Sequence, residues 1–433
     1  MIASVLRVPP WLLLPFLLPL LLTACARGEE AHGVRLTIAA SAVGAEGALL
    51  ERQVARFMRQ HPDVRVRVQR TPDDATQRHQ LFVQWLNART GDPDVLQVDV
   101  VWTAEFAAAG WILPLHRFGP PTAEFFPAAV AANTWAGELH ALPWFVDVGM
   151  LYWRTDLLPR APASMRELLD AAERAGAAAT PRYGIVWQGA RYEGLVTVFN
   201  EYLGATGGRM LTDDGRAAVQ EPASVRALAL MREQLARGAA PMEVLTWHEE
   251  ETRFAFQNGD ALLMRNWPYA YALLADAAAS SVAGRVAVAP MPAADGGAPT
   301  ATLGGAALAV NRYGEHPDAA YALAAYLTAP EQMLERAAVG GYFPARPALF
   351  TEPRLARVLA VPVDQAYAVV LRARPRPVTP VWSQLSELLQ IQLHRALAGQ
   401  VSPEVALRTA AEQMDAAMAR TGVRELMART GRP

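Results

Sequence analysis

The amino-acid sequence contains no lysine, because all 40 of its basic residues are arginine. A Walker phosphate-binding loop, a Schiff-base enzyme and a Ser-Lys catalytic pair each depend on a lysine amine. The absence of lysine therefore excludes these three kinds of site.

Cysteine is nearly absent as well, since Cys25 is the only one among 433 residues. A single thiol cannot form an intramolecular disulfide or a cysteine-based metal cluster. The formal net charge of −2 gives no support for nucleic-acid binding. A hydrophobic content of 52% with 19% charged residues is typical of a globular chain rather than a disordered one.

Familiar catalytic and metal-binding motifs are missing too. The sequence has no G-x-S-x-G and no C-x-x-C motif, and residues 248–252, HEEET, lack the second histidine of H-E-x-x-H. The acidic pair at residues 213–214 lacks the spaced ligands of a calcium loop and indicates a turn. We therefore expect neither a metal nor another cofactor. The eight histidines show no ligand-like spacing, at positions 32, 61, 79, 116, 140, 248, 316 and 394.

The N-terminal segment has the pattern of an export signal. Residues 11–22 form an apolar block of 12 residues, too short for a membrane-spanning helix, which needs about 20. The tetrapeptide LTAC, which ends at Cys25, resembles a bacterial lipobox. This resemblance implies that residues 1–24 are removed and that lipid on Cys25 anchors the protein to a membrane, outside the cytoplasm. A retained anchor helix, or an ordinary signal followed by a chance cysteine, is the alternative.

The remaining 409 residues are more than one hydrophobic core usually serves, since chains beyond about 250–300 residues tend to divide. In their first part, strand and helix patterns alternate. This alternation predicts parallel strands under helical cover, and therefore an α/β fold. Strands are predicted at residues 34–41, 64–70 and 94–102, and helices at residues 48–60 and around residues 81–86.

Helical patterns predominate after about residue 145. The segments 143–147 and 299–304 are candidate crossings between two lobes. The later predictions are helices at residues 164–176, 223–238, 316–332, 382–398 and 403–419, strands at residues 285–292 and 304–310, and a hairpin at residues 211–222.

Three carboxylates stand where a ligand site is expected. Asp99 interrupts an apolar strand near its C-terminal end, and open α/β sheets bind ligands outside such ends. Asp147 lies among apolar and aromatic neighbours, and Glu46 lies in a glycine-flanked turn before a helix. A buried carboxylate needs an arginine, backbone amides or the hydroxyls of a ligand. A structural ion pair, or the helix dipole in the case of Glu46, is the alternative explanation.

Several aromatic residues are predicted in loops or at strand ends rather than on helical stripes. A sugar ring offers C–H groups to an aromatic face and hydroxyls to charged groups, so flat rings beside carboxylates and arginines favour a carbohydrate ligand. A single tryptophan more often belongs to the core, and the prediction therefore depends on the combination. The candidates are Trp102, Trp144, Phe145, Trp247, Trp267 and Tyr269.

Seven segments resemble, in chain order, the extracellular solute-binding proteins of carbohydrate ABC importers (family 1), most closely the trehalose/maltose-binding lipoproteins. The resemblance runs through essentially the whole mature chain. The segments are the lipobox, DVLQVDVVWTAEFAAAGWILPL (94–115), LPWFVDVGMLYWRTDLL (142–158), FQNGDALLMRNWPYAY (256–271), GGAALAVN (304–311), YLTAPEQM (326–333) and RPVTPVWSQLSELL (376–389).

This resemblance implies a two-lobe periplasmic-binding-protein fold with an interlobe ligand cleft and hinge crossovers. One lobe would hold residues 34–145 plus 302–345, and the other residues 146–301 plus 346–433. Phe145 departs from relatives that carry a tyrosine there, and the loss of its hydroxyl would remove one hydrogen bond to the sugar. Carried over position by position, the contacts to a disaccharide would be Glu46, Arg78, Asp99, Phe145, Asp147, Trp267, Tyr269, Gly305 and Arg376.

On this basis we expect a monomeric, lipid-anchored receptor rather than an enzyme. It would bind an α-linked glucose disaccharide, trehalose or maltose, and deliver it to the transmembrane permease subunits of an ABC importer with a cytoplasmic ATPase. One alternative is a different oligosaccharide or a glycerol phosphodiester on the same scaffold. Another is a glycoside hydrolase that uses two of the carboxylates of Glu46, Asp99 and Asp147.

Overall fold

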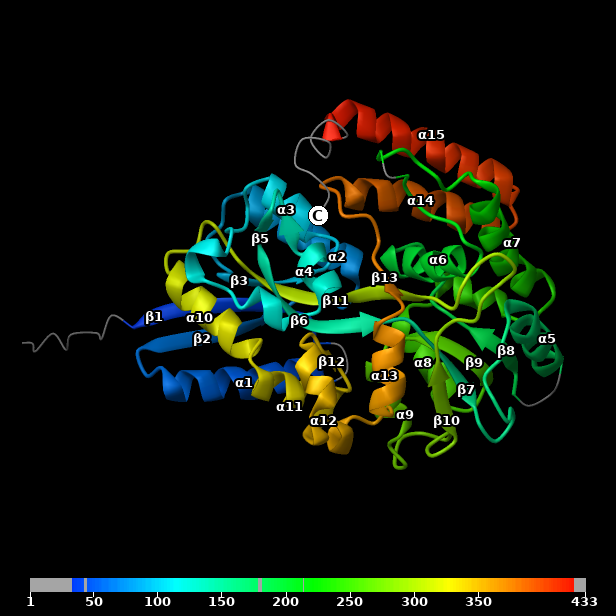
Figure 1. Ribbon diagram of the computed structural model, residues 1–433, viewed down its shortest axis with the longest axis horizontal. Coiled ribbons are helices and arrows are strands. Elements are labelled where there is room, and N and C mark those ends of the chain that lie inside the picture. Colours follow the sequence, from blue (N-terminus) through cyan, green and yellow to red (C-terminus); the bar gives the residue numbers. More distant parts are fainter. Residues whose placement is uncertain (1–32, 43–44, 178–180, 213, 424–433) are drawn as a thin grey trace, which may run out of the picture.

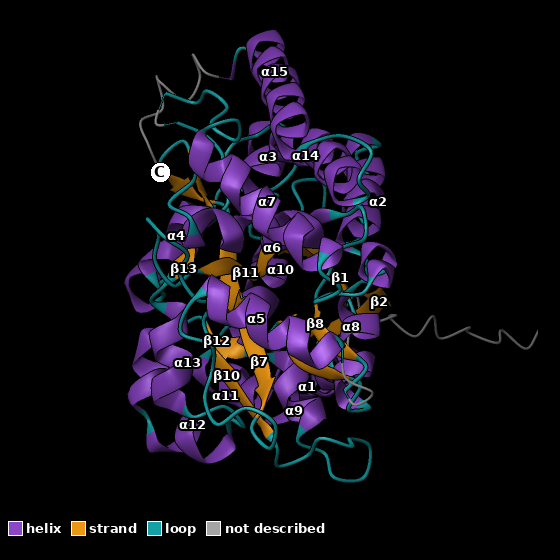
Figure 2. Ribbon diagram, turned by 90° about the vertical axis from the view of Figure 1, so that its right-hand side faces the viewer, coloured by secondary structure: helices purple, strands orange, loops and turns teal. Residues whose placement is uncertain are grey.

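The computed structural model of the protein describes residues 33–42, 45–177, 181–212 and 214–423. The predicted signal peptide and Cys25 lie outside these residues. The strands form one sheet of seven strands and one of four, at opposite ends of the long axis, together with a small two-stranded pair (Figure 1). In the view along that axis the strands run through the centre with helices outside them (Figure 2). This is the expected two-lobe α/β architecture.

The larger sheet is built on the first three predicted strands. β1 (Val34–Ala40) pairs in parallel with β2 (Val64–Arg70) and with β3 (Val95–Asp99), as predicted. β11 (Ala301–Val310) lies antiparallel between β3 and β6 (Ala141–Val148), so the sheet is mixed rather than wholly parallel. The strand order is β12-β6-β11-β3-β1-β2, with β12 (Phe343–Pro344) at one edge and β13 (Ala373–Arg374) paired to the start of β11.

Several helices around the larger sheet begin at capping or proline signals that the sequence provides. Asp74 accepts a hydrogen bond from the Gln77 amide and so caps the helix that follows it. Three other helices have proline in their first turn, where its missing N–H costs nothing. The elements are α1 (Glu46–Gln60), α2 (Ala75–Asn87), α3 (Thr103–Ala108), α4 (Pro127–Ala132), α10 (Pro317–Leu327) and α11 (Pro330–Gly340), with the strand pair β4 (Thr134–Trp135) and β5 (Glu138–Leu139).

The smaller sheet has the order β10-β7-β9-β8. Its strands are β10 (Val286–Ala289), β7 (Met150–Arg154), β9 (Ala261–Asn266) and β8 (Tyr183–Val186). The helices are α5 (Met165–Gly176), α6 (Glu193–Ala205), α7 (Pro222–Ala236), α8 (Glu249–Gln257), α9 (Tyr269–Leu274), α12 (Pro353–Val358), α13 (Val363–Val370), α14 (Trp382–Leu397) and α15 (Pro403–Thr421). Short 3-10 helices lie at His116–Phe118, Thr122–Glu124, Met242–Thr246 and Pro347–Thr351.

The chain passes between the two sheets where β6 leads into β7 and where β11 begins. Gly149 separates β6 from β7, and its amide donates a hydrogen bond of 3.2 Å to the backbone oxygen of Thr302. Val148 pairs with Leu303 at the same point. The two connections therefore lie side by side, next to the predicted crossings at residues 143–147 and 299–304.

Three predicted elements differ from the structure. The helix predicted at residues 316–332 is two helices, because the chain leaves the helical path at Thr328 and Ala329 before Pro330 begins α11. The strand predicted at residues 94–102 ends at Asp99, whose carboxylate accepts the Val101 amide and starts a turn. The hairpin predicted at residues 211–222 contains a single antiparallel bridge, Leu211 to Ala217, rather than paired strands.

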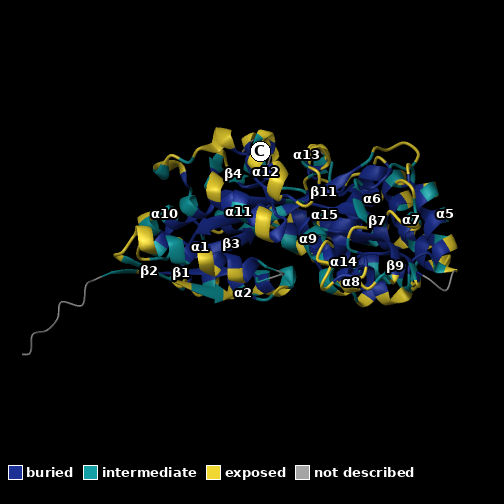
Figure 3. Cartoon of the chain, turned by 90° about the horizontal axis from the view of Figure 1, so that it is seen from below, coloured by how far each residue is buried: buried dark blue, intermediate teal, exposed yellow. Residues whose placement is uncertain are grey.

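Buried residues fill the interior of both halves of the molecule, whereas exposed residues lie on the outer helices and loops (Figure 3). No helix in the part of the chain that the structure describes is both long enough and apolar enough to cross a membrane.

Candidate ligand-binding cleft

A cavity of about 420 Å³ lies between the two sheets. This volume is in the range of small-molecule sites, which measure about 300–1,000 Å³. All nine predicted contact residues line it. They are Glu46 in the first turn of α1, Arg78 on α2, Asp99 at the end of β3, Phe145 and Asp147 on β6, Trp267 after β9, Tyr269 at the start of α9, Gly305 on β11 and Arg376 after β13. The structure thus brings together residues that are up to 330 positions apart.

Three of the six predicted aromatic candidates do not line the cavity, and for these the prediction was wrong. Trp144 is fully buried in β6, with the guanidinium of Arg336 3.8 Å from its ring centroid. Trp102 packs in the core with Phe82 and Phe106. Trp247 packs edge-on against Tyr183. Proximity to glycine and polar residues in the sequence did not distinguish a cavity wall from the core.

Glu46 is a buried carboxylate that is fully hydrogen-bonded on the protein side. It accepts hydrogen bonds from the Ser41 hydroxyl and from Gln97, the latter at 3.3 Å. It also forms a buried ion pair of 2.9 Å with Arg336 on α11. Glu46 therefore has a structural ion pair in addition to the predicted place in the first turn of a helix, and the same carboxylate also faces the cavity.

Asp147 has a different environment, because its Oδ1 atom is buried without a hydrogen-bond partner among the described residues. Burial and the negative charges of Glu46 and Asp99 raise the pKa of Asp147 to about 8, although Arg336 and Arg265 act in the opposite direction. The carboxyl group of Asp147 is therefore largely protonated at neutral pH. In that form it can donate a hydrogen bond to an oxygen atom of a ligand.

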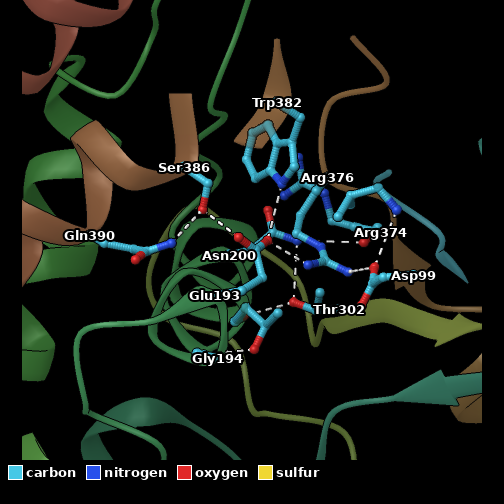
Figure 4. A network of polar contacts seen from close by, with 12 residues as sticks. Asp99, Glu193, Gly194, Asn200, Thr302, Arg374, Arg376, Trp382, Ser386 and Gln390 are labelled. Carbon is cyan, nitrogen blue, oxygen red and sulfur yellow. Dashed lines mark hydrogen bonds and ion pairs between the residues drawn. The ribbon is translucent and has the colours of Figure 1, made fainter. Parts of the chain in front are cut away.

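Arg376 joins two carboxylates that come from different parts of the chain (Figure 4). Its guanidinium donates to Glu193 at 2.5 Å and to Asp99 at 3.3 Å. Glu193 is held in turn by Trp382 and Ser386 of α14. Both Nη atoms of Arg376 are engaged by carboxylates, and its buried Nε atom has no hydrogen-bond partner among the described residues.

Trp267 forms an aromatic wall of the cavity, and the guanidinium of a buried arginine packs against its ring. The guanidinium of Arg265 lies 3.9 Å from the ring centroid, which is cation–π distance. Arg265 is itself held by a fully buried ion pair with Glu201 and by Gln188 at 3.0 Å. The indole nitrogen of Trp267 donates to Glu249 at 3.3 Å.

Glycines 304 and 305 allow the Trp267 ring and strand β6 to lie close to β11. A Cβ atom at Gly304 would lie 3.1 Å from the Trp267 ring. Gly305 has a φ of +110°, and a Cβ atom there would lie 2.3 Å from the backbone oxygen of Phe145. The predicted role of Gly305 therefore has a backbone basis, since other residues would be strained at this φ and would clash with β6.

The cavity also includes polar residues that the sequence analysis missed, chiefly at the N-termini of α2 and α8. His248 precedes α8 and forms an ion pair of 3.3 Å with Asp74, the cap of α2. This hydrogen bond raises the pKa of His248. The HEEET segment was judged only as an incomplete zinc motif, although an acidic first turn also marks a helix start. The missed residues include Asp73, Asp74, Gln77, Tyr192, Glu193, His248, Glu249, Glu250, Glu251 and Tyr342.

No group of three or more side chains suited to metal binding occurs among the residues that the structure describes.

Comparisons with known proteins agree with this geometry. A family model for bacterial extracellular solute-binding proteins matches residues 41–334. A probable ABC transporter-binding protein of Deinococcus radiodurans is 36% identical over 414 aligned positions, covering 91% of this chain and 96% of that protein. The structure of T. maritima MalE3 with bound maltose is similar with a TM-score of 0.83 and 37% identity, covering 88% of this chain and 99% of that one.

A solute-binding protein of Thermotoga lettingae with bound α-D-tagatose is also similar, with a TM-score of 0.79 and 25% identity over 89% of this chain and 99% of that one. By sequence and by structure, the chain belongs to the bacterial extracellular solute-binding proteins.

Proposed function

We propose that this protein is the substrate-binding lipoprotein of an ABC sugar importer, and that its cleft binds an α-linked glucose disaccharide, maltose or trehalose. The observation that carries the proposal is the convergence of nine carbohydrate-type contact residues on one cavity. The maltose bound in T. maritima MalE3, which is 37% identical to this chain, supports a ligand of this class.

The charge of the cavity wall favours a neutral ligand over a phosphodiester. Nine carboxyl groups line the cavity, one of them the largely protonated Asp147, against two arginines and one histidine. A phosphate group would face repulsion from this excess and would need more cationic or amide donors than the wall provides. The hydroxyls of a neutral sugar can donate to carboxylates and accept from arginine, so they match the wall.

Rings and charged groups of the wall would hold a sugar in different ways. The rings of Phe145, Trp267 and Tyr269 supply apolar contact to the C–H faces. Asp99 and Arg376 supply directional hydrogen bonds. Micromolar binding corresponds to about −8 kcal/mol, which several such bonds and one or two stacked rings can supply after the cost of ordering the cleft.

The proposed mechanism is closure of two lobes around the ligand, without bond breakage. We take the lobes as residues 34–145 plus 302–345 and residues 146–301 plus 346–433. Asp99 then belongs to the first lobe and Trp267 to the second. A sugar that contacts both has a higher affinity for the closed state, and it therefore shifts the population toward that state. The closed form would be presented to the permease subunits.

Calorimetric titration with trehalose, maltose, sucrose and glycerophosphodiesters tests the proposal. We expect micromolar or tighter binding of maltose or trehalose, with stoichiometric recovery of the intact sugar. Binding of the phosphodiesters alone would exclude a sugar receptor. Sustained release of glucose would show a hydrolase instead.

The predicted membrane anchor needs a separate test, because Cys25 lies outside the described residues. Metabolic labelling with a radioactive fatty acid should mark the wild-type protein, and the Cys25→Ser variant should carry no label. Equal labelling of both proteins would contradict a lipid on Cys25.

A further inference from the structure

Arg336 lies on α11, just behind one wall of the cavity, and does not line the cavity itself. It is buried, with 1% of its surface exposed. Its Nη2 atom donates to Glu46 at 2.9 Å. Its guanidinium carbon also lies 3.8 Å from the centroid of the Trp144 ring, 4.7 Å from that of Tyr342 and 5.0 Å from that of Phe145.

This guanidinium depends on its charge partner and on the rings, because its other hydrogen-bonding capacity is unused. The Nε and Nη1 atoms of Arg336 have no hydrogen-bond partner among the described residues. A buried cation of this kind is stabilised by a close carboxylate and by the negative faces of aromatic rings. Any displacement of Glu46 or of the rings would therefore raise the energy of the cation.

The groups that Arg336 contacts form part of the sugar-facing wall. Glu46, Phe145 and Tyr342 all line the cavity, although they come from α1, β6 and the segment before β12. The buried side chain of Arg336 thus contacts all three. The helix that carries it is fixed to α1 by further contacts, from Gln53 to the backbone oxygen of Gln332 and to Glu335, each at 3.0 Å, and from Arg56 to Glu335.

We propose that Arg336 is a positioning residue of the cleft, which fixes the Glu46 carboxylate and the rings of Phe145 and Tyr342 in the geometry that receives the sugar. Its effect on a sugar ligand rests on the proposed function. Its effect on the geometry of the wall can be measured without ligand.

Arg346 provides a matched control. It is also a buried arginine, with 6% of its surface exposed, paired to Glu124 and placed 4.4 Å over the ring of Phe125. Its Nε atom also donates to the backbone oxygen of Thr328 at 3.1 Å, and neither Arg346 nor any of these three partners lines the cavity. Loss of Arg346 therefore reproduces the structural cost of losing a stacked, ion-paired arginine without disturbing the wall.

The first arm of the experiment measures maltose binding by calorimetry. Arg336→Met is expected to weaken binding at least about tenfold, while Arg346→Met, compared at equal folded fraction, stays within about twofold of the wild type. Arg336→Lys keeps a charge for Glu46 but cannot lie flat on the rings, so its loss should be intermediate. If Arg336→Met binds like Arg346→Met, the inference is wrong.

A double-mutant cycle then separates positioning from general destabilisation. In the Glu46→Gln background the carboxylate that Arg336 holds is already gone, so Arg336→Met should weaken maltose binding by less than in the wild-type background. The same fold-loss in both backgrounds would mean that Arg336 does not act through Glu46.

The second arm needs no sugar and follows the carboxyl group of Asp147 by ¹³C NMR, assigned with Asp147→Asn. The charged groups that act on Asp147 are Glu46, Arg336, Asp99 and Arg265, and Arg336 lowers its pKa. Arg336→Met should therefore raise the pKa of Asp147, whereas Arg346→Met should leave it unchanged.

An unchanged titration in Arg336→Met would overturn the inference whether or not maltose binds. If the wild-type protein bound no saccharide while the titration moved in Arg336→Met and also, with the charge kept, in Arg336→Lys, the proposed function would fail and the positioning role would stand.

Discussion

Burial and neighbouring carboxylates oppose the ionisation of the Asp147 carboxyl group. This environment lowers the free energy of unfolding at high pH. Its pKa is raised to about 8. Between about pH 4 and pH 8 the folded protein keeps a proton that the unfolded chain has lost, so the free energy of unfolding falls as the pH rises through this window. Above about pH 8 the decrease in the free energy of unfolding has reached its full size.

Asp147→Asn should therefore be more stable than the wild type at pH 8.5, by on the order of 2–5 kcal/mol, and close to it at pH 4. Urea unfolding at both values measures the difference. A stability gain that does not depend on pH would contradict the raised pKa. Stabilisation by removal of a site residue is common where function requires strain.

Trp267 and Asp99 provide the direct test of the cleft at the scale of single residues. Trp267→Ala removes a ring that lines the cavity, and Asp99→Ala removes a carboxylate from its wall. Each should weaken disaccharide binding at least about tenfold, which corresponds to about 1.4 kcal/mol. Trp247→Ala is a control, because Trp247 packs outside the cavity. Wild-type affinity in both site variants would mean that the contact residues are assigned wrongly.

The limits of sequence reasoning are visible at this same scale. Phe145 and Trp144 are neighbours in one strand, yet Phe145 lines the cavity and Trp144 packs under Arg336. Which of two adjacent aromatic residues faces a cleft depends on the pairing and the bulge of β6 with β11, where the register shifts between Ala306 and Ala307. Such a shift depends on tertiary contacts and leaves no mark in composition or local pattern.

At the scale of elements, local sequence patterns correctly predicted helices and strands that depend mainly on local interactions. The alternation of valine with polar residues predicted β2, and the amphipathic stripe predicted α1, because one covered face is enough to fix each of them. The division of residues 316–332 into α10 and α11 was missed, although Pro330 carries a signal for a new helix start. The antiparallel insertion of β11 between β3 and β6 could not be predicted from local pattern, since it joins strands about 160–210 residues apart.

Gly149 tests the junction between β6 and β7. A Cβ atom there would lie 1.7 Å from Oε1 of Glu201 and 2.4 Å from Nη2 of Arg265. Gly149→Ala should therefore separate the buried pair that supports Trp267, with a loss of about 3–5 kcal/mol in the free energy of unfolding. Chemical denaturation measures this loss.

Gly284→Ala is the control for this substitution. Gly284 has a φ of +72° and no atom near its Cβ position, so it should cost only about 1 kcal/mol of backbone strain. Equal losses in the two variants would show that the contact with the ion pair is not the cause.

At the scale of the whole molecule, the predicted lobes touch each other across the cavity at more than one point. Asp74 and His248 form an ion pair between α2 and the start of α8. Ser383 at the start of α14 donates to Glu105, next to His79 of α2. Arg376 bonds Asp99. Any of these contacts that break when the lobes open would favour the closed state and so contribute to ligand affinity.

The His248–Asp74 pair makes part of this closure sensitive to pH. The hydrogen bond to Asp74 raises the pKa of His248. Although burial opposes it, the hydrogen bond from His248 lowers the pKa of Asp74. The contribution of His248 is therefore complete below its ordinary value of about 6.5 and is lost as the pH rises through the raised value. The contribution of Asp74 is lost only in acid, below about pH 4.

We therefore expect the affinity for maltose to fall as the pH rises from 6 to 9. The loss of this partly exposed pair should account for roughly a threefold decrease in affinity. Asp147→Asn serves as the background, because Asp147 titrates in the same range. In that background His248→Gln should remove this share of the dependence. His116→Gln should not, because His116 pairs with Glu138 within one predicted lobe. Calorimetry across the pH range decides the matter: an equal slope with and without His248 would mean that the pair does not stabilise the closed state.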